Sequence, residues 1–173
     1  MFKYGSIRLF FIKFILGVIL TGFGLISIGS LLTYSVNDPG FKTLTNNSEI
    51  YNFFGIYGAY LSSYTLILIG SLSYLTAIFL AIEGTKLFLG VRNGYVFIKF
   101  LLNILGVIAL STILSKLSLS FGHTGLIGDF LNVVILKFIY SFTSSIFVEY
   151  LILILLFVIG LFLILFSFSI RIN

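Results

Sequence analysis

The chain has no cysteine, no tryptophan, a single histidine (His123) and a single proline (Pro39). Without cysteine there is no disulfide framework and no thiolate metal site, and His123 has no second histidine with which to share a metal ion. Charged residues are scarce as well, at 9% of the chain against roughly 25% in soluble domains. So little charge cannot cover a surface that faces water, which excludes a soluble protein.

Long apolar runs fill most of the chain, which is 60% hydrophobic with a mean hydropathy of +1.23. A helix rises 1.5 Å per residue, so about 20 apolar residues cross the roughly 30 Å of membrane hydrocarbon. We therefore predict an all-α integral membrane protein that forms one domain over residues 1–173. Its four transmembrane helices are expected at 9–32, 59–82, 94–114 and 150–170.

Residues 130–148 are also apolar, but Asn132, Lys137 and a cluster of serine and threonine at 141–145 interrupt them. A charge in the middle of a span costs at least about 2.5 kcal/mol on insertion scales. We therefore expect a re-entrant or interfacial helix here, within a loop that covers 115–149, and not a fifth span.

The distribution of lysine and arginine predicts the orientation. With both termini in the cytoplasm, seven of these residues lie on the inner side, whereas Lys42, Lys116 and Lys137 lie outside. Cytoplasmic segments carry the excess of positive charge, so loops 33–58 and 115–149 are expected to be periplasmic. The ten cations are scattered along the chain, so no direct contact with nucleic acid is expected.

Two features within the spans indicate helix packing. Ser73, Ala77 and Ala81 are spaced by four, which places three small side chains on one stripe for close helix contact. Asn103 is expected to hydrogen-bond another helix, with a role in transport as the alternative. Lys99 is expected to reach back to the headgroups, and Glu83 to lie in a polar link, so that no span carries a buried acid.

The two loops contain the motifs with the most distinctive spacing. Asn37-Asp38-Pro39-Gly40 predicts a turn, because asparagine or aspartate can close it, proline fixes φ and glycine accepts a positive φ. There is no G-x-x-x-x-G-K-[ST] or H-E-x-x-H motif, so we expect no cofactor, no metal and no catalytic residue. The candidate interaction residues are Asp38, Pro39, Asn52, Gly55, Gly58, Gly122, Gly125 and Gly128.

Together these motifs resemble the N-terminal membrane domain of the FtsK/SpoIIIE DNA translocases. The resemblance covers about residues 7–170, and Gly122 to Gly128 resembles the second external loop of that family, with Thr124 where a second glycine is common. The residues that carry it are Leu32 to Ser35, Asn37 to Pro39, and Asn52, Gly55, Gly58 and Ala59.

The resemblance implies a four-span anchor in a bacterial inner membrane that brings a DNA translocase to the division septum. It also implies support of divisome assembly and chromosome segregation, contacts with division proteins, and a homo-oligomer, a hexamer in that family. The family's ATP-driven motor is not among these residues, so its activity is not expected of them.

The alternative is a small multi-span transporter or channel subunit. The glycines of the first helix, Asn103 and the interrupted segment 130–148 favour it, because discontinuous helices line transport sites. The expected lack of ionisable pairs within the spans argues against it. A membrane-embedded enzyme is the third hypothesis, and the absence of acid–base pairs from the spans disfavours it.

Overall fold

A computed structural model describes residues 4–41, 49–91, 95–117, 124–142 and 145–169. These residues form helices and loops without a strand, and four helical stretches are long and apolar enough to cross a membrane. The prediction of an all-α membrane protein with four spans and an additional helix is therefore confirmed. The elements are α1 (Tyr4–Leu32), α2 (Gly55–Ile69), a 3₁₀ turn η1 (Gly70–Leu72), α3 (Ser73–Phe88), α4 (Val96–Leu117), α5 (Leu126–Phe142) and α6 (Ile146–Ser169).

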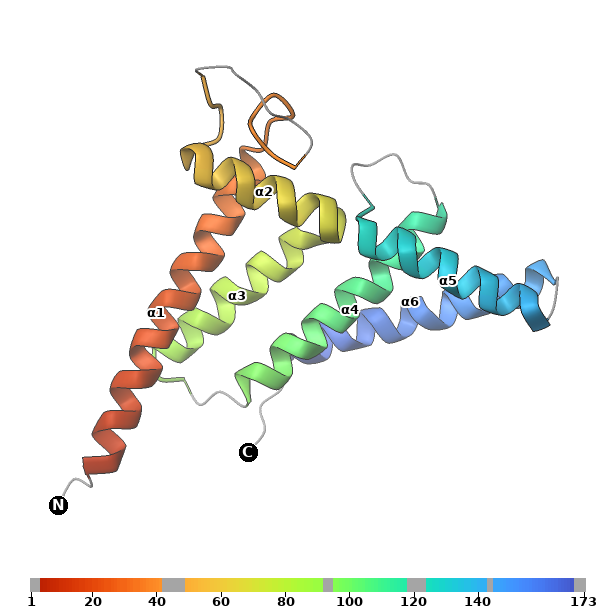
Figure 1. Cartoon of the computed structure of the whole chain (residues 1–173). Helices are drawn as coiled ribbons and strands as arrows, with labels where there is room; N and C mark the ends of the chain where they lie inside the picture. Colours follow the sequence, from red (N-terminus) through yellow and green to blue (C-terminus); the bar gives the residue numbers. More distant parts are fainter. Residues whose placement is uncertain (1–3, 42–48, 92–94, 118–123, 143–144, 170–173) are drawn as a thin grey trace.

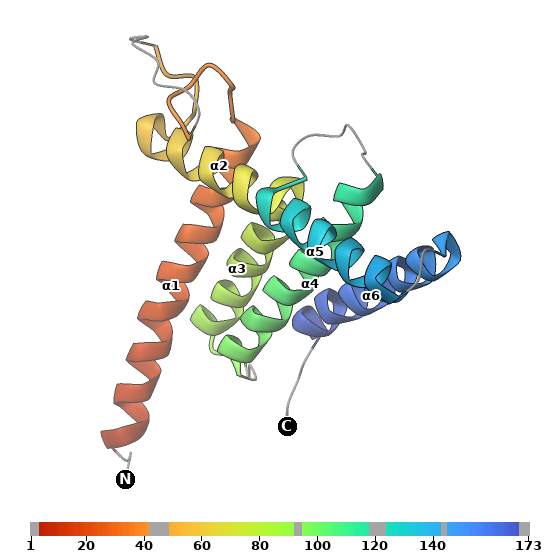
Figure 2. The same cartoon turned by 45° about the vertical axis from the view of Figure 1, so that its right-hand side comes forward.

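Two helix pairs make up most of the molecule: α1 packs along α3, and α4 packs along α6 (Figures 1 and 2). Helix α2 lies across the upper end of the α1–α3 pair in both views, and α5 begins beside it and contacts α4. We call this end, where α1 ends and α2 and α5 begin, the loop end. The opposite end, where α3 ends and α4 begins, is called the link end.

The second span differs from the expected single helix over 59–82. The chain instead forms α2 and α3, which meet at an angle at η1 (Figure 1). Gly70 has φ 80°, a conformation that glycine adopts readily and that ends α2. Hydropathy cannot reveal this break, because both helices are apolar on either side of it. Helix α3 is 16 residues long, about 24 Å at the rise of an α-helix.

Small residues bring α1 and α3 into contact through their backbones. A Cβ atom on Gly24 of α1 would overlap the backbone of Ala81, and one on Gly84 of α3 would overlap the backbone of Thr21. Ala77 is also buried against this face, with 3% of its surface exposed. Such close approach gains dispersion contacts, which hold helices together where the surrounding lipid is equally apolar.

The last two helices differ in their bounds from the expected segments. Helix α5 covers Leu126–Phe142, so it starts before residue 130, and α6 begins at Ile146, ahead of the expected 150. Lys137 is exposed on α5, where it avoids burial of its charge. The position of α5 relative to the membrane surface stays a prediction.

Candidate functional site

Asp38 organises the loop between α1 and α2. Its carboxylate accepts the backbone N–H of Tyr51 at 2.8 Å through one oxygen and that of Asn52 at 2.9 Å through the other. Asp38 is buried, with 3% of its surface exposed. Its backbone N–H donates to the carbonyl of Ser35 at 3.2 Å, which closes a turn directly before Pro39. Hydrogen bonds to an ionised acceptor are stronger than neutral ones. Asp38 therefore joins the part of the loop that follows α1 to the part that precedes α2.

Asn52 joins the same loop to the end of α1. Its side-chain amide donates to the carbonyls of Ser30 at 2.8 Å and Thr33 at 3.4 Å, and its oxygen accepts the N–H of Phe54 at 3.1 Å. The last carbonyls of a helix have no partner within the helix, so Asn52 supplies one for α1. A Cβ on Gly58 would overlap the Asn52 side chain, which explains the glycine at that position.

The spacing Asn-x-x-Gly-x-x-Gly therefore has a structural reason at each position. Gly55 has φ 61°, where glycine is favoured, and its N–H donates to the Asn52 carbonyl at 2.8 Å. We call Asp38, Asn52, Gly55 and Gly58 the loop anchor. Because Asp38 and Asn52 are buried, neither of them presents its polar atoms to a partner.

The exposed side chains next to the loop anchor are aromatic. Tyr51 is 63% exposed, Phe53 78% and Tyr57 85%. We call these three residues the aromatic face. No spacing in the sequence marks these three residues, since aromatic residues are frequent throughout the chain and only the folded structure shows which ones are exposed.

The second glycine motif forms a junction between three helices. A Cβ on Gly125, whose φ is 85°, would lie 2.6 Å from the backbone nitrogen of Gly70, and one on Gly128 would overlap Ser111 of α4. The Ser111 hydroxyl donates to the carbonyls of Thr124 at 2.5 Å and Ile69 at 3.3 Å. Gly125 and Gly128 thus let α5 start against η1 and α4. Gly122 lies outside the described residues.

A buried ion cluster at the link end overturns the expectation that no span carries an acid. Glu83 is 1% exposed on α3, and its carboxylate pairs with Lys99 of α4 at 3.1 Å and with Lys86 at 2.6 Å. Lys86 also donates to the carbonyl of Phe168 in α6 at 3.2 Å. The hydrophobic helix continues beyond residue 82, and Lys99 turns inward to Glu83 instead of reaching to the headgroups.

Asn103 lies fully buried between α4 and α6. Its amide nitrogen is 3.5 Å from the Ser167 hydroxyl, which itself donates to the carbonyl of Ile164 at 2.7 Å. Nearby, a Cβ on Gly106 would lie 2.7 Å from the Ile164 side chain and 2.9 Å from the Gly160 carbonyl oxygen, so these two helices also approach each other closely. The residue is part of a helix contact.

A third buried acid connects the last three helices. Glu149 of α6 is 3% exposed and forms an ion pair with Lys116 of α4. The Tyr140 hydroxyl of α5 donates to the same carboxylate at 2.9 Å. This hydrogen bond to Glu149 raises the pKa of Tyr140 above its usual value of 10.0. Within the described residues, no group of three histidine, cysteine or acidic side chains could hold a metal ion.

Comparison with known proteins matches residues 11–171 to the 4TM region of DNA translocase FtsK/SpoIIIE. Among curated proteins, the chain is similar to DNA translocase FtsK of Rickettsia prowazekii (strain Madrid E), at 34% identity over 102 residues. That similarity covers 59% of this chain but 13% of the relative, so the chain spans a small part of the relative's length. No solved structure matches it significantly.

Proposed function

This chain belongs to the family of the 4TM region of the FtsK/SpoIIIE DNA translocases, and from that membership we propose that it is the membrane anchor and interaction domain of a cell-division DNA translocase. In this proposal it brings the translocase to the division septum in the inner membrane and supports divisome assembly and chromosome segregation. The carrying observation is the match over residues 11–171, which includes the last three spans completely and the first span from residue 11 onward.

The geometry of the loop anchor supports an interaction role. Asp38 and Asn52 are buried and hold the described parts of the loop, 33–41 and 49–54, by hydrogen bonds to backbone groups, which supports a defined shape for those parts. The exposed aromatic face of Tyr51, Phe53 and Tyr57 is composed of side chains that are enriched at protein interfaces. We place the contact with division proteins there, on the periplasmic side, with Asp38 and Gly125 keeping it in shape.

Orientation is tested by topology reporters. With the termini in the cytoplasm, fusions after Ser48 and Phe121 are expected to respond as periplasmic, and fusions after Leu89 and Asn173 as cytoplasmic. The reason is the excess of lysine and arginine on the side of the termini. A periplasmic response at Asn173 would contradict both the four-span topology and the proposed position of the aromatic face.

Septal targeting is tested with the chain tagged at Asn173 in dividing bacteria. The parent is expected to concentrate at mid-cell and to restore division to cells that lack their own anchor, but not chromosome segregation. A variant with Phe53→Ser and Tyr57→Ser should insert into the membrane yet lose the mid-cell signal, whereas Asn37→Ala, an exposed loop change, should keep it. Uniform membrane fluorescence of the parent throughout division would refute the proposal.

The absence of motor activity from the isolated chain is a separate expectation. The purified protein in detergent should neither hydrolyse ATP nor bind DNA, because it lacks a phosphate-binding motif and its cations lie at separate helix ends. The homo-oligomer proposed from the family is measured in the same preparation by light scattering. ATPase activity stimulated by DNA would contradict the assignment of the chain as an anchor alone.

One observation favours the second candidate, a transporter or channel subunit. The Glu83–Lys99 pair is buried within apolar helices, and ionisable residues at such positions often mark ion pathways. Purified protein in sealed vesicles should then conduct ions or protons, and Glu83→Gln should abolish the conductance. If the vesicles do not conduct ions and the tagged chain concentrates at mid-cell, the anchor function is supported and the Glu83–Lys99 pair serves helix packing.

A further inference from the structure

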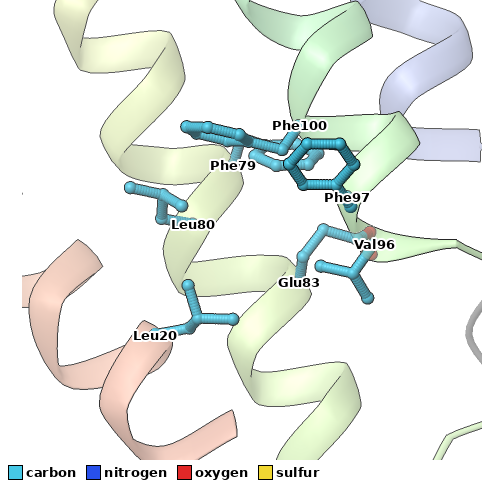
Figure 3. A pocket seen from close by; sticks show the side chains of 7 residues that line it. All are labelled: Leu20, Phe79, Leu80, Glu83, Val96, Phe97 and Phe100. Carbon is cyan, nitrogen blue, oxygen red and sulfur yellow. The ribbon is translucent and has the colours of Figure 1, made fainter. Parts of the chain in front are cut away.

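An apolar hollow of about 240 Å³ lies between α1, α3 and α4 (Figure 3). Leu20 reaches it from α1, Phe79 and Leu80 from α3, and Val96, Phe97 and Phe100 from α4, as the close-up shows. Glu83 stands at its edge and is the one lining residue that carries a charge. Cavities with apolar walls stay dry and accept apolar ligands, so a hydrocarbon chain suits this hollow.

A second hollow, of about 320 Å³, follows along the same groove toward the link end. Lys13 and Phe14 of α1 and Leu87 and Phe88 of α3 line it. Lys13 and Leu20 are seven residues apart and so lie on one face of α1, as Leu80 and Leu87 lie on one face of α3. The two hollows therefore follow one another along the α1–α3 pair, before and after the point where Gly17 approaches the Gly84 carbonyl, and Lys13 lines the outer one. We call the two hollows together the groove.

The groove carries positive charge at the end where headgroups lie. Lys13 is exposed. Glu83 is the one acid among the residues that line the two hollows, and it is already paired with both Lys86 and Lys99. Lys86 uses two of its three ammonium protons, for Glu83 and for the Phe168 carbonyl, and its side chain is 32% exposed. Neither Lys86 nor Lys99 lines either hollow, so the cation that the groove offers to a phosphate group is Lys13.

The dimensions fit a membrane phospholipid. Lys13 and Leu20 are about 10 Å apart along the helix axis, at 1.5 Å per residue. One leaflet of hydrocarbon is about 15 Å thick, half of the bilayer core. A lipid whose phosphate lies at Lys13 thus reaches the apolar hollow with its acyl chain, and basic pockets between membrane helices are known to take anionic lipids.

We propose that the groove between α1, α3 and α4 is a binding site for an anionic phospholipid, with the phosphate at Lys13 and an acyl chain against Leu20, Phe79 and Phe100. The proposal rests on the membrane location of the chain and not on its role in division. Glu83 forms part of the wall, and its ion pair with Lys99 neutralises the acid.

The absence of tryptophan allows a direct test, because one introduced tryptophan is the sole indole of the chain. Phe100→Trp places it in the hollow, and the protein is put into phosphatidylcholine vesicles with a small fraction of brominated phosphatidylglycerol or brominated phosphatidylcholine. Bromine on the acyl chain quenches the fluorescence on contact. Brominated phosphatidylglycerol is expected to quench at a several-fold lower fraction than brominated phosphatidylcholine.

The charge of Lys13 is tested in the same background. Lys13→Gln should lower the preference for phosphatidylglycerol about fivefold, the factor for one lysine at an anionic lipid surface. Lys137→Gln, which removes an exposed cation of α5, should leave the preference unchanged. Phe162→Trp on the exposed surface of α6 should report equal quenching by the two lipids.

Three results would overturn the proposal. These are equal quenching of Phe100→Trp by both lipids, a preference that Lys13→Gln does not alter, and no quenching by either lipid. The last would mean that protein, such as a helix of a second copy, covers the hollow. If Phe100→Trp does not fold, Phe97→Trp at the edge of the hollow gives the same readout with the same expectations.

Discussion

Of the three buried carboxylates among the described residues, Asp38 at the loop end and Glu83 at the link end are held in different ways. At the loop end, Asp38 accepts two backbone N–H groups from residues 13 and 14 positions further along the chain. At the link end, Glu83 pairs with the ammonium groups of Lys86 and Lys99, the latter from another helix. The first acid shapes one loop, whereas the second joins α3 to α4 and, through Lys86, to α6.

This contrast teaches how the same kind of side chain can serve local or long-range structure. Loss of Asp38 leaves neutral donors that water can satisfy once the loop opens. Loss of Glu83 leaves cations that remain within apolar helices, where their charge is expensive. The effect of a substitution should therefore be larger at the link end and should extend over more helices. Four predictions test this, from the largest expected effect to the smallest.

Glu83→Gln is expected to destabilise the protein most, by about 3–5 kcal/mol, because it removes the anion that pairs with buried Lys99. Thermal or denaturant unfolding in detergent micelles measures the change. Glu49→Gln, which alters an exposed acid of the first loop, is the control and should have little effect. The double variant Glu83→Gln with Lys99→Met should recover part of the loss. A single variant as stable as the parent would show that the cluster contributes nothing.

Gly125→Ala tests whether a backbone contact at the loop end contributes as much to stability as a buried charge does. A methyl group there would lie 2.6 Å from Gly70 N, so we expect about 1–3 kcal/mol from overpacking and about 1–2 kcal/mol from the positive φ. Gly55→Ala is the matched control, since Gly55 also has a positive φ but no atom within 4 Å of the added Cβ. Equal losses of stability in the two variants would mean that the backbone around Gly70 shifts to accommodate the added methyl group, so that the close contact contributes nothing.

Asp38→Asn should have a local effect of about 1–3 kcal/mol, because an amide N–H₂ then faces a backbone donor. Hydrogen exchange of the Tyr51 and Asn52 amides should accelerate, while amides of α3 and α4 keep their protection. Asn37→Ala changes the exposed neighbour and should leave the exchange unaltered. Protection at Tyr51 and Asn52 that survives Asp38→Asn would show that the carboxylate does not hold the loop.

Tyr140→Phe should have the smallest effect, because it removes one hydrogen bond from Glu149 and leaves the Lys116 ion pair in place. The raised pKa of Tyr140 means that this bond favours the folded state fully below the ordinary tyrosine pKa. The contribution is lost as pH rises through the raised pKa. Stability of parent and variant should therefore converge at high pH. A difference that grows with pH would contradict the assigned bond.

The two loops show which structural features the spacing of a motif can predict and which it cannot. Asn37 to Gly40 predicts a turn, whereas the hydrogen-bonded turn closes two residues earlier, between the Ser35 carbonyl and the Asp38 N–H. The sequence also could not say that the Asp38 carboxylate would bond Tyr51 and Asn52. Those residues come close only when the chain returns from residue 41 to 49. The same applies to Gly125, whose neighbour Gly70 is 55 positions away in sequence.

The sequence by itself determined the class of the protein and the number of spans, since hydropathy is a local property. Tertiary structure alone decided that α2 and α3 part at Gly70, and that Glu83 and Lys99 meet. A charge at the end of an apolar run can face headgroups or turn inward, and both choices give the same pattern. Only a cation on a neighbouring helix makes the inward choice favourable.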